Sequence, residues 1–119
     1  MTCLMAGAVA LALAAPGFTL HWTHSVEKTE WVETWEIRPH SLYLAQARIT
    51  GNGAGMEPGE GAVADNGGWV WSPDIEVPEL SLAASGSTGA GWRLCDGTTC
   101  HTLGDTPGRP IRLAPCDSP

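Results

Sequence analysis

The order of hydrophobic and polar residues along the chain predicts a series of β-strands. Apolar and polar residues alternate over residues 18–26, and successive side chains of a strand point to opposite faces, so this segment predicts a half-buried strand. Residues 31–37 are rich in aromatic and β-branched residues and also predict a strand, although Trp31 and Trp35 would share one face of a helix equally well. Residues 42–50 predict a third strand, in which Leu42, Leu44 and Ala45 pack.

Shorter apolar runs with frequent turn residues follow these three segments. A glycine-rich segment, residues 51–68, comes first, and loops of this length are uncommon inside compact domains. The short runs lie at residues 69–71, 78–83, 92–95, 100–103 and 111–113. Short strands with regular turn signals are typical of all-β domains. We therefore predict an all-β fold, namely a small antiparallel β-sandwich or barrel with a long glycine-rich loop.

The first residues form an apolar, uncharged stretch that differs from the rest of the chain. Residues 3–15 are mostly small or apolar and precede Pro16 and Gly17. This stretch is shorter than the roughly 18 residues that cross a bilayer as a helix, and it ends in small residues as a signal peptide does. Residues 1–17 are therefore predicted to be a signal peptide or short apolar anchor, with a buried N-terminal helix as the alternative. Residues 18–119 would then form a single β domain that is periplasmic or otherwise exported.

The four cysteines comprise one close pair and two distant residues. Cys95 and Cys100 flank an Asp-Gly turn signal, and cross-strand cysteines beside a turn can satisfy disulfide geometry in an oxidising compartment. We therefore predict a Cys95–Cys100 disulfide, while Cys3 would leave with the leader and Cys116 would be free or pair between chains. One alternative is a zinc site made of these two cysteines, His101 and Cys116, and another is a stretched haem-attachment motif in the same Cys-x₄-Cys-His sequence. The disulfide is favoured, so no metal or cofactor is expected.

The formal net charge is −7, and no cluster of Lys or Arg is present. Nucleic acids and anionic membrane surfaces bind clustered positive charge, so no nucleic-acid partner is expected. Membrane contact is expected only through the leader or through a membrane partner. Glutamates recur at every third residue from Glu27 to Glu36. On a strand this spacing alternates between the two faces, so we interpret these residues as a solvated acidic edge rather than a Ca²⁺ site.

Nothing in the sequence forms a convincing catalytic constellation. His24, Ser25 and Glu27 are the residue types of a hydrolytic triad, but neighbours on a strand face opposite ways, so His24 does not easily reach the Ser25 hydroxyl. The glycine-rich segment lacks the Lys-Ser or Lys-Thr of a phosphate-binding loop, and its two glutamates would repel phosphate. The protein is therefore expected not to be an enzyme.

Six tryptophans are a high number for a chain of this length. Trp69 and Trp71 would share one face of a short strand. If exposed, they would make a stacking platform for a sugar or an anchor for a protein partner. If buried, they would fill the core, which is the favoured interpretation.

Two separated segments resemble a known bacterial family. The first reads His24-Ser25-Val26-Glu27 and is followed by Trp31, and the second reads Gly53-Ala54-Gly55-Met56-Glu57. In this order they resemble the family called domain of unknown function 1850, over about residues 18–103. The resemblance implies a small exported protein without an established activity. Members of this family are commonly encoded beside TAXI-type TRAP transporters, which take up organic solutes with the help of a periplasmic receptor.

The leading hypothesis is therefore a non-catalytic periplasmic accessory or interaction domain associated with a TRAP-type solute uptake transporter. Its partner would be the transporter permease or the periplasmic solute receptor. The binding or interaction candidates are His24, Ser25, Glu27, Trp31, Gly53, Gly55, Met56 and Glu57. Such a face requires both segments to lie at the same edge of the fold. The alternatives are a small-ligand or sugar-binding module that uses Trp69 and Trp71, and a metal or haem protein that uses Cys95, Cys100 and His101.

Overall fold

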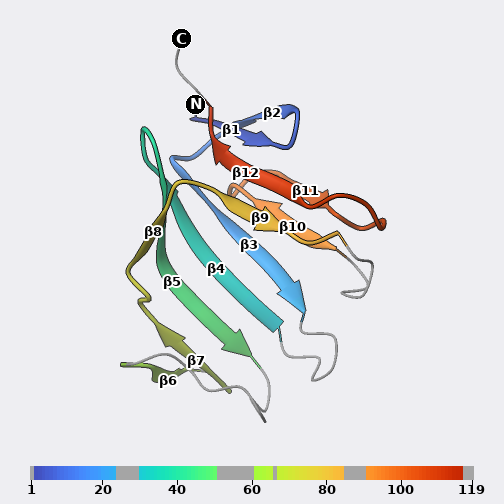
Figure 1. Ribbon diagram of the computed structural model, residues 1–119. Helices are drawn as coiled ribbons and strands as arrows, with labels where there is room; N and C mark the ends of the chain where they lie inside the picture. Colours follow the sequence, from blue (N-terminus) through green and yellow to red (C-terminus); the bar gives the residue numbers. More distant parts are fainter. Residues whose placement is uncertain (1, 24–29, 51–60, 66, 85–90, 117–119) are drawn as a thin grey trace.

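The protein is built from β-strands in the computed structural model, which describes residues 2–23, 30–50, 61–65, 67–84 and 91–116 (Figure 1). In chain order the strands are β1 (Thr2–Ala6), β2 (Val9–Leu13), β3 (Gly17–Thr23), β4 (Glu30–Ile37), β5 (Leu42–Thr50), β6 (Val63–Asp65), β7 (Gly68–Trp71), β8 (Ile75–Val77), β9 (Leu80–Leu82), β10 (Trp92–Cys95), β11 (Cys100–Leu103) and β12 (Ile111–Pro115). In these described ranges, no helix is long and apolar enough to cross a membrane.

The strands form two antiparallel sheets. The larger sheet has the order β11-β10-β3-β4-β5-β7-β6, with β8 also paired to β5, and the smaller sheet has the order β2-β1-β12-β9. The long strands β3, β4 and β5 form the centre of the larger sheet (Figure 1). The predicted all-β sandwich is therefore confirmed, and the sheets do not close into a barrel. Residues 31–37, for which a helix was the alternative, form most of strand β4.

A β-bulge changes which side chains of β5 are buried. Thr34 pairs with Gln46 and Trp35 pairs with Leu44, so Ala45 is an extra residue between two paired positions. One extra residue reverses the alternation along the strand. As a result, Leu44 and then Ala47 and Ile49 are buried, while Ala45 is not. The prediction that Ala45 packs is therefore wrong, because Ala45 directly follows Leu44 and points to the other face. The bulge, which sequence alternation does not reveal, buries Ala47 and Ile49 instead of Gln46 and Arg48.

The apolar N-terminal stretch forms the hairpin β1–β2 of the smaller sheet. Gly7 supplies the positive φ of +63° that its turn requires. Leu4 and Leu13 are 0% exposed and belong to the core, so the stretch is extended rather than the buried helix considered as an alternative. Whether the cell removes these residues as a signal peptide stays a prediction.

The structure pairs Cys116 with Cys3, which corrects the expectation that Cys116 is free or pairs between chains. Their Cα atoms are 5.4 Å apart, and the disulfide joins residues separated by 113 positions. The Cys116 amide also donates a hydrogen bond to the Cys3 carbonyl over 3.2 Å. The disulfide therefore covalently links the first strand, β1, to the residue that follows the last strand, β12.

The core lies between the smaller sheet and one end of the larger sheet. On the smaller sheet it is formed by Leu4, Ala6, Leu13, Leu82 and Leu113, and on the larger sheet by Phe18, Leu20, Trp35, Leu42, Leu44 and Leu94. These positions on the long strands are the start of β3, the end of β4 and the start of β5. Ala47 and Ile49, near the other end of β5, are also buried but lie outside this cluster. The far half of the same face therefore does not belong to the shared core.

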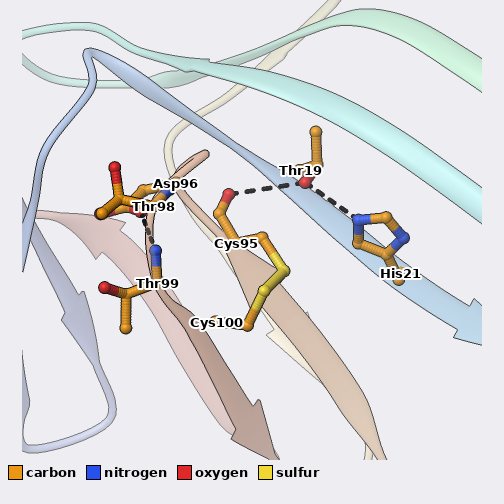
Figure 2. Close-up of a disulfide and its surroundings, with 7 residues drawn as sticks. All are labelled: Thr19, His21, Cys95, Asp96, Thr98, Thr99 and Cys100. Atoms are coloured by element: carbon orange, nitrogen blue, oxygen red, sulfur yellow. Dashed lines mark hydrogen bonds between the residues drawn. A yellow bond between two sulfur atoms is a disulfide. The ribbon is translucent and has the colours of Figure 1, made fainter.

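The predicted Cys95–Cys100 disulfide closes the β10–β11 hairpin (Figure 2). The two cysteines are direct cross-strand partners with Cα atoms 4.1 Å apart. Asp96 shapes the turn, because its carboxylate accepts hydrogen bonds from the Thr98 and Thr99 amides over 2.9 and 2.7 Å. It also accepts from the Ala14 amide, and these backbone donors, Ala14 first, lower the pKa of Asp96 to about 2.

This disulfide bears on the zinc and haem alternatives. A disulfide sulfur is not a thiolate, and the thiolate is the form of cysteine that binds metals. With both Cys95–Cys100 and Cys3–Cys116 formed, none of these sulfur atoms is available for zinc or for a thioether bond to haem. The described residues also contain no cluster of three or more His, Cys, Asp and Glu side chains suited to a metal ion. The residues present therefore do not fit either group in the oxidised protein.

Candidate functional site: a tryptophan face beside Glu33

One face of the larger sheet carries all six tryptophans of the chain. Strand pairing places Trp22 beside Trp31, Trp31 beside Ile49, and Ile49 beside Trp69. Paired residues of an antiparallel sheet point to the same face, and so do alternate residues along each strand. Trp35 is part of the core described above. The other five, which we call the tryptophan face, are Trp22, Trp31, Trp69, Trp71 and Trp92. Trp92 packs against the edge of the core, and the other four lie outside it.

Four rings of the tryptophan face, one each from β3, β4, β7 and β10, contact one another. Trp22 and Trp31 are stacked with ring centroids 5.1 Å apart and an interplanar angle of 14°. Trp22 also contacts Trp92 at 5.4 Å, and Trp31 meets Trp71 edge to face at 5.9 Å. Each such pair adds roughly 0.5–1.5 kcal/mol beyond the burial of its area. The contacts hold the rings in fixed relative positions, as a preorganised binding surface requires.

The rings stay partly accessible to solvent. Trp69 is 38% exposed, and Trp22, Trp31 and Trp71 are each partly buried. Trp92 is held against the segment that follows β9, because its Nε1 donates a hydrogen bond to the Ala83 carbonyl over 2.9 Å. The indole Nε1 of Trp31 is buried and has no hydrogen-bond acceptor among the described residues. The interpretation of Trp69 and Trp71 as core residues is therefore incomplete, because they extend an aromatic surface that reaches solvent.

Glu33 lies on the same face as the tryptophans, in the next row of paired residues. It is paired with Leu20 on one side and Ala47 on the other. Its carboxylate accepts a hydrogen bond from Trp35 Nε1 over 3.0 Å and another from the Trp22 side chain. Burial raises the pKa of Glu33, and these two hydrogen bonds only partly oppose the effect.

No cation compensates this carboxylate within the described part of the chain. The salt bridges found there join Arg38 to Glu36 and Glu76, Arg48 to Asp65, and Arg112 to Glu79. A partly buried carboxylate with a raised pKa is a feature of binding and catalytic sites more than of structural surfaces. Interpreting Glu33 as part of a solvated acidic edge is therefore wrong. The signal was available in the sequence, because Glu33 alternates with Trp31 and Trp35 and must share their face.

Replacing Glu33 by Gln is expected to raise stability at neutral pH. The pKa of Glu33 is higher in the folded state than in the unfolded state. The contribution of the Glu33 carboxyl to the free energy of unfolding is therefore fully present below the unfolded-state pKa and is lost as pH rises through the folded-state pKa. Gln keeps an oxygen acceptor for Trp35 and carries no charge. We expect Glu33→Gln to gain up to about 1 kcal/mol in the free energy of unfolding at pH 8 and almost nothing at pH 4.

Urea unfolding at the two pH values measures this difference. Glu36→Gln is the matched control, because Glu36 is exposed and alternates to the opposite face of β4. A loss of stability in Glu33→Gln at pH 8 would contradict the expectation that the charge of Glu33 destabilises the folded protein.

The described strand ends that flank the two family-like segments lie side by side in the larger sheet, next to the tryptophan face. His24, Ser25 and Glu27, and Gly53, Gly55, Met56 and Glu57, lie outside the described residues. The strand ends next to them are described, however: Thr23 pairs with Glu30, and Glu30 pairs with Thr50. Trp31 is the only one of the predicted interaction candidates among the described residues, and it stands at the centre of the tryptophan face. Trp22, Glu33 and Trp92 were missed by the sequence reasoning.

The fold and the site together define an all-β sandwich domain with an open aromatic face and a carboxylate beside it. The chain belongs to the family Domain of unknown function (DUF1850), whose family model matches residues 18–103. The match includes β3 to β11 and thus the whole tryptophan face, whereas β1, β2 and β12 lie outside it. Neither a curated protein nor a solved structure matches the chain.

Proposed function

We propose that this protein is an exported, non-catalytic binding domain whose tryptophan face contacts a partner, and that the partner belongs to a TRAP-type solute uptake system. The observation that carries the proposal is the position of four tryptophans, Trp22, Trp31, Trp69 and Trp71, outside the shared core. They lie toward the end of the sheet where the described strands adjoin both family-like segments. A fold that needed these rings only for stability would place them between its two sheets, as it does Trp35.

The aromatic face suits binding for energetic reasons. Tryptophan is enriched among the residues that dominate binding energy, because one ring covers a large area and loses few rotatable bonds. The ring contacts fix Trp22 and Trp31 in place before a partner arrives, which reduces the ordering cost of association. Trp69, at the exposed end, would make the first contact.

Two further observations support an exported accessory role. Two disulfides are typical of proteins in oxidising compartments, and their presence is compatible with the periplasm. The link to a TRAP transporter rests on the family resemblance, since such proteins are commonly encoded beside these transporters. The permease and the periplasmic solute receptor are the two partners that this link nominates.

Affinity purification from gently solubilised membranes tests the proposal. We expect the tagged wild-type protein to enrich permease or receptor peptides over an untagged control, and Trp69→Ala to reduce that enrichment at least fivefold. Val63→Ala is the matched control, because Val63 is an exposed apolar residue, 66% accessible, on the neighbouring strand β6 and outside the tryptophan face. If none of the three proteins enriched a transporter component over the untagged control, the transporter link would be overturned.

The tryptophan face also favours a second candidate function, a small-ligand or sugar-binding module. Aromatic rings stack on the apolar faces of sugars and on flat or cationic ligands, and Trp69 and Trp71 point to the same face beside Trp31. Titration of the purified protein with a panel of solutes, followed by tryptophan fluorescence, tests this function. A flat response to every solute would count against it.

A further inference from the structure

We propose that the tryptophan face and Glu33 form a binding site for a small organic cation, a solute that carries an alkylammonium group. The inference rests on the tryptophan face being the binding surface of the proposed function, and it adds the chemical class of the ligand.

The first argument is the uncompensated carboxylate. Glu33 is partly buried between Leu20 and Ala47, and the described residues offer its oxygens two indole donors but no positive charge. Keeping a carboxylate in such surroundings costs stability unless a cation balances it. A cationic ligand would balance it in the bound state.

The second argument is the nature of the surrounding rings. Tryptophan attracts cations over its face more strongly than tyrosine or phenylalanine does, and clusters of aromatic rings are a known way to hold quaternary ammonium groups. Trp31 presents one ring between Trp22, stacked on it, and Trp71, which meets it edge to face. Glu33 lies one row away on the same face, so aromatic rings and a negative charge occupy neighbouring rows of the sheet.

The third argument separates an organic cation from other ligands. A metal ion needs several converging oxygen, nitrogen or sulfur ligands, and the described residues contain no such cluster. A neutral sugar would leave the charge of Glu33 uncompensated. An organic cation with alkyl groups suits both the carboxylate and the aromatic rings, since its charge would face Glu33 while its methyl or methylene groups contact the rings.

Ala47, the row-mate of Glu33, is a small residue and is 2% exposed. Strand pairing aligns Glu33, Ala47 and Trp71 in one row across β4, β5 and β7. A larger side chain at position 47 would stand between the carboxylate and the Trp71 ring. The reversal of alternation at the bulge is what places Ala47 on this face.

Calorimetric titration of the purified protein with choline chloride tests the proposal. The matched ligand is 3,3-dimethylbutan-1-ol, which has the shape of choline but carbon in place of the charged nitrogen. We expect choline to bind at least tenfold more tightly than the neutral alcohol. Glu33→Gln is expected to weaken choline binding at least tenfold and to leave the affinity for the alcohol nearly unchanged.

Two further variants keep the result interpretable. Glu36→Gln removes an exposed charge from the opposite face of β4 and is expected to bind choline like the wild type. Trp69→Ala removes an exposed ring of the tryptophan face and is expected to weaken the binding of both ligands. Far-UV circular dichroism confirms that each variant is folded.

Three results would overturn the inference. They are choline and the neutral alcohol binding equally, choline binding that survives Glu33→Gln, and an arginine-containing peptide binding this face while choline does not. None of these results depends on a transporter. If Trp69→Ala loses transporter peptides while choline does not bind, the cation inference alone fails and the proposed function stands.

Discussion

Replacing Cys3 and Cys116 together by serine is expected to lower the free energy of unfolding by about 4–5 kcal/mol, because the bond closes a loop of more than 100 residues. Cross-linking residues so far apart restricts the unfolded chain strongly. Single domains are stable by only about 5–15 kcal/mol, so the loss would be a large fraction of the total. The bond also holds β1 against β12, where Leu4 and Leu113 are both 0% exposed.

The matched control is the double replacement of Cys95 and Cys100 by serine. These residues are only 5 positions apart, so the same entropy argument gives about 2 kcal/mol. The β10–β11 turn would still be held by the hydrogen bonds to Asp96. Urea unfolding of both double variants under oxidising conditions measures the two losses.

The order of the two losses also tests the processing of the N-terminus. If residues 1–17 are cleaved on export, the exported protein lacks Cys3, and the variant lacking both Cys3 and Cys116 would unfold like the wild type. An intact mass that includes residues 2–13 and both disulfides, together with the larger loss, would show that the β1–β2 hairpin is part of the mature domain. Mass spectrometry and urea unfolding of one exported preparation therefore distinguish a cleaved leader from a retained β1–β2 hairpin.

The second large effect is expected for Trp35→Ala, which should lower the free energy of unfolding by about 3–5 kcal/mol. Trp35 is 4% exposed and is the largest side chain in the shared core. Its removal would leave a cavity opposite the smaller sheet, and it would also take away one of the two indole donors to Glu33. Trp69→Ala, on the exposed end of the tryptophan face, is expected to cost less than about 1 kcal/mol.

Trp35→Phe separates packing from hydrogen bonding. Phe fills much of the indole volume but cannot donate to Glu33, so we expect a loss of about 1–3 kcal/mol, with the pKa of Glu33 rising further above its ordinary value. Titration of the Glu33 carboxyl by NMR in both proteins measures the pKa change. An unchanged pKa in Trp35→Phe would show that the Trp35 hydrogen bond does not act on the carboxylate.

Much of the local structure could be predicted from the pattern of residues. Alternation over residues 18–26 and 42–50 predicts strands, and β3 and β5 occupy residues 17–23 and 42–50. The Asp-Gly turn between Cys95 and Cys100 likewise predicts the disulfide hairpin that the structure contains. These features depend on neighbours in the chain, and period-two alternation and turn residues express them directly.

The apolar N-terminal stretch shows where such prediction fails. Its composition suits a signal peptide, a helix or a buried strand equally, since each needs only a short apolar run. Pairing with β12, more than 100 residues away, decides that Thr2–Leu13 contributes two strands and that Cys3 meets Cys116. The pattern of the first residues alone cannot reveal that β12 and Cys116 are their partners.

The sequence by itself determined that this protein is an all-β domain of its family, with a hairpin disulfide and an excess of tryptophan. Only the tertiary structure decided where the tryptophans and Glu33 lie relative to one another. The pairing of β10, β3, β4, β5 and β7 gathers rings from four separate segments onto one face, and the bulge at Ala45 sets which residues of β5 join them. Strand register depends on pairing between distant segments, and it is what places scattered aromatic residues and one glutamate on one face.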